Sequence, residues 1–208
     1  MITPTQFKPA ILADLIGPAA AVGRILESKI LRLRADPGAT LKAMFYGAPG
    51  VGKTELARLL AAALGNHPFA IEEVSGLRVN VELVKDWMST AGVGALFGDW
   101  QVKVVHEMDR IPTAAQDLLL HYLDTLPPRR AFIGTSNLQM DLLQERFQTR
   151  MQTWKVEGPS TEEIIAFITD RWPIIPRQIA AQIAVGCGGN VRAALLDTES
   201  QLDVQLAA

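Results

Sequence analysis

One segment constrains the fold of this chain more than any other, the run G-A-P-G-V-G-K-T at residues 47–54. An apolar stretch of strand character, Leu41 to Tyr46, precedes it. Leucines and alanines at helical spacing follow it as far as Gly65, which is placed to end that helix. A glycine-rich turn between strand and helix lets successive backbone N–H groups face one anion, and the helix N-terminus adds a partial positive charge. The segment therefore predicts a phosphate-binding loop, with an ordinary glycine-rich turn as the alternative.

The end of this loop points to a nucleotide and its metal ion. A lysine at position 53 neutralises the oxygens of the β- and γ-phosphates, and a threonine hydroxyl at position 54 can join the shell of Mg²⁺. ATP and Mg²⁺ are therefore the expected cofactors. The predicted nucleotide-binding residues of the segment are Gly47, Pro49, Gly50, Val51, Gly52, Lys53, Thr54 and Glu55.

The rest of the chain alternates strand-like and helical patterns before becoming purely helical. Further strand-like runs lie at 69–74, 102–106, 131–135 and 153–156, and a helical pattern at 114–126 is stopped by two prolines. We therefore expect an α/β fold, a three-layer sandwich around a parallel five-stranded sheet. After residue 158, Ser160 and Glu163 match a capping box, and helical patterns at 176–185 and 190–204 follow. The predicted domains are residues 1–158 (α/β) and 159–208 (all-helical).

Composition narrows the function classes. The 208 residues carry 20 basic and 22 acidic side chains, a net charge of −2, which argues against a disordered chain and against a wholly nucleic-acid-binding surface. The single cysteine cannot form an internal disulfide. The first 18 residues lack the pattern of a signal peptide, and no apolar run is long enough to span a membrane. We expect a cytoplasmic protein without membrane contact.

Five further stretches resemble the AAA+ ATPase family, most closely its clamp-loader branch of replication factor C and DNA polymerase III subunits. They lie at residues 8–17, 102–109, 132–137, 148–151 and 188–192, in the family's order, so the resemblance covers nearly the whole chain. It implies a P-loop NTPase core with a helical lid, and ATP bound in the cleft between them. Clamp loaders also have a C-terminal collar domain, for which no segment follows the predicted lid here.

The apolar run at 102–109 resembles the family's strand ending in Asp-Glu-x-Asp. The resemblance makes Glu107 the general base that polarises the attacking water, a role that needs a carboxylate at a strand end. In place of the preceding metal-binding aspartate this chain has His106, whose neutral ring brings no charge to Mg²⁺, so metal affinity or hydrolysis should fall. Asp109 is the candidate that partly compensates. The alternative is that Glu107 and Asp109 only begin a solvated turn.

Two polar residues match positions that sense the γ-phosphate in the family. Asn137 follows the apolar strand at 131–135, although asparagine also commonly ends a strand in a turn. Arg192 matches the arginine of the family's lid, with a solvated helix arginine as the alternative. Asn190 is a good helix N-cap and places Arg192 in the first helical turn, where a cation is unfavourable by about 0.3–1 kcal/mol unless an anion binds there.

The stretch at 148–151 resembles the clamp-loader segment that carries an arginine finger, which completes the site of a neighbouring subunit. Arg150 is the favoured finger and Arg146 its rival; a solvated loop position is the alternative for both. Other AAA+ subunits, identical or different, are therefore expected partners. DNA is a possible partner through Arg78, Lys85 and Arg110, whose alternative is scattered surface charge.

These residues favour an ATP-hydrolysing AAA+ motor subunit, of clamp-loader or helicase-loader type, in DNA replication or a related DNA transaction. Because of His106, the main alternative is a nucleotide-binding structural subunit with weak catalysis. A small-molecule kinase of the P-loop class fits less well, because the predicted arginine-bearing lid lies at the C-terminal end of the chain and not inside it.

Overall fold

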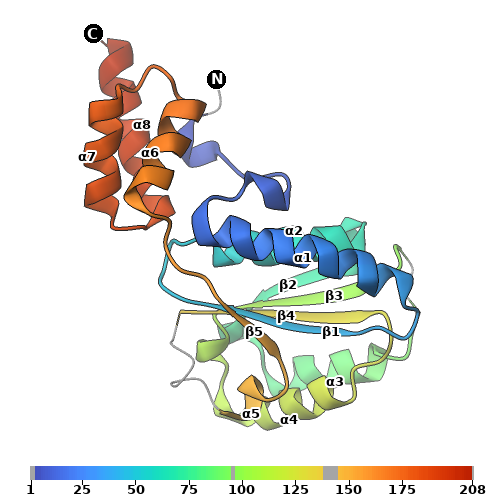
Figure 1. Ribbon diagram of the computed structural model, residues 1–208. Helices are drawn as coiled ribbons and strands as arrows, with labels where there is room; N and C mark the ends of the chain where they lie inside the picture. The colour runs from blue at the N-terminus through green and yellow to red at the C-terminus, as the bar shows by residue number, and fades with distance from the viewer. Residues whose placement is uncertain (1–2, 95–96, 138–144, 208) are drawn as a thin grey trace. The chain divides into compact units, whose positions relative to one another are not determined.

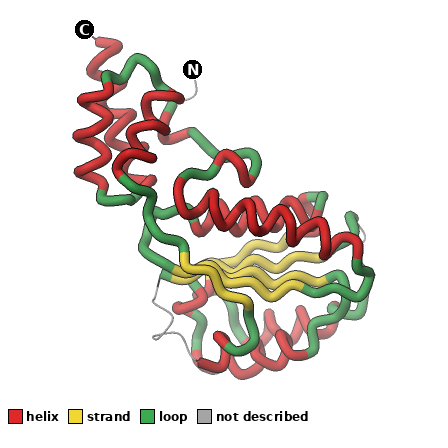
Figure 2. Tube along the Cα trace, in the orientation of Figure 1, coloured by secondary structure: helices red, strands yellow, loops and turns green. Residues whose placement is uncertain are grey.

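The computed structural model describes residues 3–94, 97–137 and 145–207. They form two compact units (Figures 1 and 2). The sheet unit comprises Ile25–Gly47 and Ala57–Lys155, and the helical unit comprises Met1–Arg24, Ala48–Leu56 and Val156–Ala208. These units interleave along the chain, whereas the predicted domains divide it at residue 158. That division stays a prediction.

The sheet unit contains the parallel five-stranded sheet that the sequence predicts. Its strands are β1 (Leu41–Tyr46), β2 (Ile71–Ser75), β3 (Gln101–His106), β4 (Arg130–Ser136) and β5 (Gln152–Lys155), in the order β2-β3-β4-β1-β5. All paired strands are parallel, so their carboxyl ends meet at one edge of the sheet: Tyr46 pairs with Ser136, and Ser75 pairs with His106. The central strand β4 is buried along its whole length, because helices cover both faces of the sheet.

Helices cover the sheet on its two faces (Figure 1). One face carries α1 (Gly17–Ala35) and α2 (Lys53–Gly65), and the other carries α3 (Val81–Thr90), α4 (Thr113–Asp124) and the short α5 (Glu145–Gln148). Short 3₁₀ turns, η3 (Pro68–Ala70), η4 (Gly76–Arg78) and η5 (Met108–Arg110), connect strands and helices. Helix α4 ends before the predicted boundary because Thr125 caps it, ahead of the two prolines.

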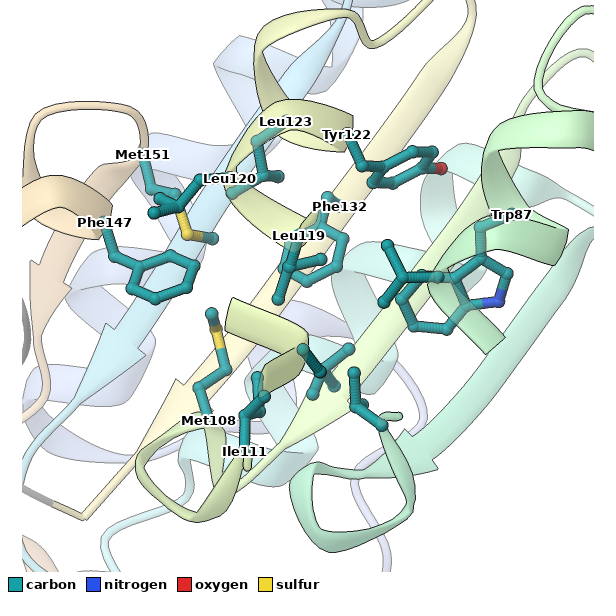
Figure 3. Packing of buried hydrophobic residues seen from close by; sticks show 14 of the residues in the cluster. Trp87, Met108, Ile111, Leu119, Leu120, Tyr122, Leu123, Phe132, Phe147 and Met151 are labelled. Atoms are coloured by element: carbon teal, nitrogen blue, oxygen red, sulfur yellow. The ribbon is translucent and has the colours of Figure 1, made fainter. Parts of the chain in front are cut away.

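An aromatic core fixes α3 and α4 on the sheet (Figure 3). Trp87 of α3, Tyr122 of α4 and Phe132 of β4 pack together, with the Trp87 and Tyr122 ring centroids 5.9 Å apart and all three side chains buried. Burial raises the pKa of Tyr122 to about 12, so its hydroxyl stays neutral. Each such side chain contributes about 1.5–3 kcal/mol through burial, which makes the sheet a rigid support for the groups at its edge.

The helical unit has its own apolar core. Its helices are α6 (Thr161–Arg171), α7 (Arg177–Cys187) and α8 (Val191–Ala207), with the 3₁₀ turns η1 (Pro4–Gln6) and η2 (Leu12–Asp14). The predicted capping box is confirmed, since Ser160 Oγ accepts from the Glu163 N–H and Glu163 Oε2 accepts from the Ser160 N–H. Phe7 packs edge-on against Phe167 at 5.4 Å and joins the N-terminal segment to this core.

Candidate active site

The phosphate loop has the backbone that its glycines predict. Gly50 (φ 79°) and Gly52 (φ 99°) adopt positive φ angles, which residues with a Cβ rarely tolerate. Helix α2 then begins at Lys53, whose side chain is buried with Nζ donating to the Ala48 carbonyl at 2.6 Å. The loop therefore holds a cation and a helix N-terminus within one short segment, as an anion site requires.

The same loop is bonded to the start of helix α8 inside the helical unit. The Val191 N–H donates to the Gly50 carbonyl at 3.0 Å, and Asn190 Oδ1 caps α8 by accepting from the Ala193 N–H at 3.1 Å. A Cβ on Gly50 would lie 1.9 Å from that Oδ1 atom. Arg192 is exposed in the first turn of α8. Residues 48–54 of the phosphate loop and the predicted sensor Arg192 thus belong to the same helical unit.

At the carboxyl ends of β3 and β4 lie the polar side chains that we call the strand-end cluster: His106, Glu107, Asp109, Thr135, Ser136 and Asn137. The Gly47 N–H, at the start of the phosphate loop, donates to the Ser136 carbonyl at 3.3 Å. The sheet unit therefore brings the first loop residue and the end of β4 together, as parallel strand pairing requires.

Glu107 has a left-handed backbone, φ 55° and ψ 55°, which is costly for a residue with a side chain. Gly76 makes room for it, since a Cβ there would lie 2.2 Å from the Glu107 carbonyl oxygen. The Glu107 N–H donates to Thr135 Oγ1 at 3.3 Å, and the carboxylate forms a 3.0 Å ion pair with Arg110. Strain of this kind is common at functional positions.

His106 is bonded on both ring nitrogens. Its Nε2 lies 2.5 Å from Glu73 Oε1, and its Nδ1 lies 3.4 Å from Thr135 Oγ1. Arg58 of α2 forms a 2.7 Å ion pair with the same Glu73 oxygen. Although burial acts to raise the pKa of Glu73, the hydrogen bonds and charges of Arg58 and His106 lower it below its ordinary value. Glu73 is therefore ionised at neutral pH.

Asp109 holds the end of β4. Its Oδ1 accepts from the Ser136 hydroxyl at 2.9 Å and from the Asn137 N–H at 3.2 Å, and Asn137 is exposed. No group of three or more His, Cys, Asp or Glu able to hold a metal occurs in the described part of the chain. A Mg²⁺ ion bound with a nucleotide needs only one or two carboxylates besides phosphate oxygens, so the role predicted for Thr54 and Asp109 stays a prediction.

The two candidate finger arginines differ in how firmly they are held. Arg150 Nε donates to both carboxylate oxygens of Asp124 at 2.9 Å, and its Nη1 donates to the Arg146 carbonyl at 2.9 Å. Arg146 has one 2.7 Å ion pair with Asp117, and both of these side chains are mostly exposed. A guanidinium held at two points is better oriented than one in a single surface ion pair.

The sequence reasoning missed Glu73, Thr135 and Asp124, each of which holds a predicted site residue. Thr135 could be found from the sequence, because a polar side chain inside a buried apolar strand needs a hydrogen-bond partner. Glu73 and Asp124 could not, because surface carboxylates on a strand and a helix are common. The candidate DNA-contact residues Arg78, Lys85 and Arg110 are exposed, and Arg110 pairs with Glu107.

The fold and the loop together define a P-loop NTPase, as the sequence predicts. Residues 43–155, more than half of the 208-residue chain, match the family described as ATPase family associated with various cellular activities (AAA). The chain therefore belongs to the AAA family. Among the described residues, no helix is both long and apolar enough to cross a membrane.

The chain is similar to proteins whose names refer to DNA replication and recombination, among others. The chain is 25% identical over 203 residues to replication-associated recombination protein A of Bacillus subtilis, covering 91% of this chain but only 45% of that protein. The Thermotoga maritima RuvB Holliday junction branch migration motor superposes with a TM-score of 0.72 at 19% identity, covering 96% of this chain and 66% of that one. A DNA polymerase III gamma subunit-related protein of Thermotoga maritima superposes with a TM-score of 0.55 at 15% identity, covering 79% and 58%. At these identities the two structures show the shared fold alone.

Proposed function

We propose that this chain binds and hydrolyses ATP as a motor module of a DNA transaction. The single observation that carries the proposal is the phosphate loop, where glycines at positive φ precede a buried lysine at the first position of α2. Membership of the AAA family supports the same activity. In this proposal residues 1–158 form the nucleotide-binding domain and residues 159–208 its helical lid.

The loop residues perform the binding step. Backbone N–H groups of residues 47–54, apart from Pro49, surround the phosphates, and Lys53 neutralises the β- and γ-phosphate oxygens. Thr54 and Asp109 are the residues that would hold Mg²⁺, which would supply charge neutralisation on the phosphate oxygens. Arg192 at the start of α8 contacts the nucleotide from the same chain, which removes the unfavourable interaction of a cation with the helix N-terminus.

The strand-end cluster performs the chemical step. Glu107 accepts a proton from the attacking water, and Asn137 orients that water or the γ-phosphate. Arg150, held by Asp124, stabilises the charge that develops on the phosphate of a neighbouring subunit. Hydrolysis then depends on assembly with other AAA subunits, identical or different.

DNA as the polymer acted on is supported by the relatives, one named a replication-associated recombination protein and another titled a Holliday junction branch migration motor. Exposed Arg78 and Lys85 suit phosphate contacts of this kind. Within this class we propose a loader-like role, of clamp-loader or helicase-loader type. The alternative, a nucleotide-binding subunit with weak catalysis, is favoured by one observation, the histidine at position 106.

Calorimetric titration with a non-hydrolysable ATP analogue, together with a phosphate-release assay with Mg²⁺ and DNA, tests both candidates. We expect Lys53→Ala to abolish binding and Glu107→Gln to retain binding while lowering turnover about 100-fold or more. The matched control Lys85→Ala, at an exposed lysine of α3, should bind nucleotide normally. Absence of binding by the unaltered protein would refute the proposal. Normal binding with turnover equal to that of Lys53→Ala would favour the structural subunit.

A further inference from the structure

We infer that His106, held by Glu73, is a positioning residue for the candidate base Glu107 and acts through the Thr135 hydroxyl. The inference rests on the proposed function, because it assigns roles around the same catalytic carboxylate. It assigns a role to His106, which stands where the family has a metal-binding aspartate. The residues involved lie in the sheet unit, on α2 and on the neighbouring strands β2, β3 and β4.

The contacts form one continuous series of polar groups. Arg58 donates to Glu73, and Glu73 Oε1 faces His106 Nε2 at 2.5 Å. His106 Nδ1 faces Thr135 Oγ1 at 3.4 Å, and that oxygen accepts from the Glu107 N–H at 3.3 Å. Thr135 is buried and the His106 side chain is 15% exposed, so water competes little for these bonds.

The chemistry of the groups fixes the direction of the first and last bonds of the series from Glu73 to Glu107. Glu73 is ionised and only accepts, so His106 Nε2 must donate to it. Between His106 Nδ1 and Thr135 Oγ1 either atom can donate, so the contact forms whether or not Nδ1 carries a proton. The oxygen of Thr135 keeps a lone pair for the Glu107 N–H. Donors and acceptors agree along the whole series, which a chance set of contacts does not require.

Glu107 is the residue that most needs such support. Its left-handed backbone is strained, and the position of its carboxylate depends on that backbone. A general base must be held within narrow limits to act on a particular water molecule. Because both nitrogens of His106 already have protein partners, the ring serves this positioning task instead of binding metal.

Amide hydrogen exchange at Glu107 tests the inference without any need for activity. Thr135→Val keeps the side-chain shape but removes the hydroxyl, so exchange at the Glu107 N–H should rise about tenfold. Thr135→Ser keeps the hydroxyl and is the matched control, with exchange within about twofold of the unaltered protein. Glu73→Met removes the distant carboxylate and should raise exchange at Glu107 by a smaller factor, about threefold.

The kinetic counterpart separates positioning from binding. Thr135→Val and Glu73→Met should lower kcat, by about tenfold and threefold, with KM and analogue affinity unchanged, and Thr135→Ser should restore kcat. If Glu73→Met leaves both Glu107 exchange and kcat unchanged, the inference is overturned, even where Thr135→Val has an effect. If the unaltered protein neither binds nor hydrolyses ATP, the proposed function fails, while exchange still decides whether the bonds are coupled.

Discussion

The phosphate loop and the strand-end cluster are built in opposite ways. In the loop, the shape comes from backbone dihedral angles, with Gly50 and Gly52 at positive φ and a lysine bonded to a carbonyl of its own loop. In the strand-end cluster, the shape comes from hydrogen bonds of side chains, to one another, to the Glu107 N–H and, from His106, to Glu73 on the neighbouring strand β2. The cluster transmits each change to its neighbours.

The largest effect is expected from a substitution that tests whether the phosphate loop and the strand-end cluster of one chain are enough for ATP hydrolysis. Arg150→Ala leaves both intact and removes the arginine proposed to act on a neighbouring subunit, so turnover should fall about 1000-fold with analogue affinity unchanged. Mixing this variant with Lys53→Ala should restore part of the activity, since some sites then combine an intact loop with an intact arginine. Phosphate release from the mixture is the measurement.

Arg146→Ala is the matched control, because Arg146 lies on α5, four residues before Arg150, in a single exposed ion pair. It should keep turnover within about threefold of the unaltered protein. Full activity of Arg150→Ala alone would show that one chain completes its own site. A mixture no more active than its components would exclude donation between subunits.

The two regions also differ in how far the sequence predicts them. Every constraint on the phosphate loop is local: strand, glycines, lysine and helix follow one another within residues 41–65. The cap formed by Asn190 was equally readable, because its partner, the Ala193 N–H, lies three residues away. Local physics thus predicted the fold class, the strands and the capping box, all of which the structure confirms.

Local sequence patterns do not predict the environment of His106. Its partner Glu73 lies 33 residues away in the chain and becomes a neighbour only because β2 pairs with β3 in the final strand order. The support of Arg150 by Asp124 depends likewise on how α4 and the segment after α5 pack. The proposed roles of Glu107, Asn137, Arg150 and Arg192 stay predictions, since strand-end geometry alone assigns no chemistry.

A smaller effect is expected for a substitution in the phosphate loop, and it concerns the stability of the fold. Gly50→Ala places a methyl group at φ 79° and 1.9 Å from Asn190 Oδ1, so the free energy of unfolding should fall by about 1–3 kcal/mol. Gly186→Ala is the control, because nothing lies within 4 Å of its added Cβ inside helix α7 and alanine favours helix by about 0.5–1 kcal/mol. Urea unfolding measures both. A Gly50→Ala protein as stable as the unaltered one would show that the bond between loop and α8 is not rigid.

The smallest effect concerns the strand-end cluster and depends on pH. The folded protein lowers the pKa of Glu73, so this carboxylate adds stability above its ordinary pKa of 4.5 that is lost as the pH falls through the lower, folded value. Glu73→Gln should therefore unfold more easily at about pH 7, by less than about 1 kcal/mol because Glu73 is partly exposed to solvent. The difference should vanish at pH values below the folded pKa, when both proteins are neutral at this position. Glu27→Gln, which removes a carboxylate from an exposed position of α1, is the control substitution. A Glu73→Gln difference that persists unchanged in acid would mean that shape, and not charge, holds His106 in place.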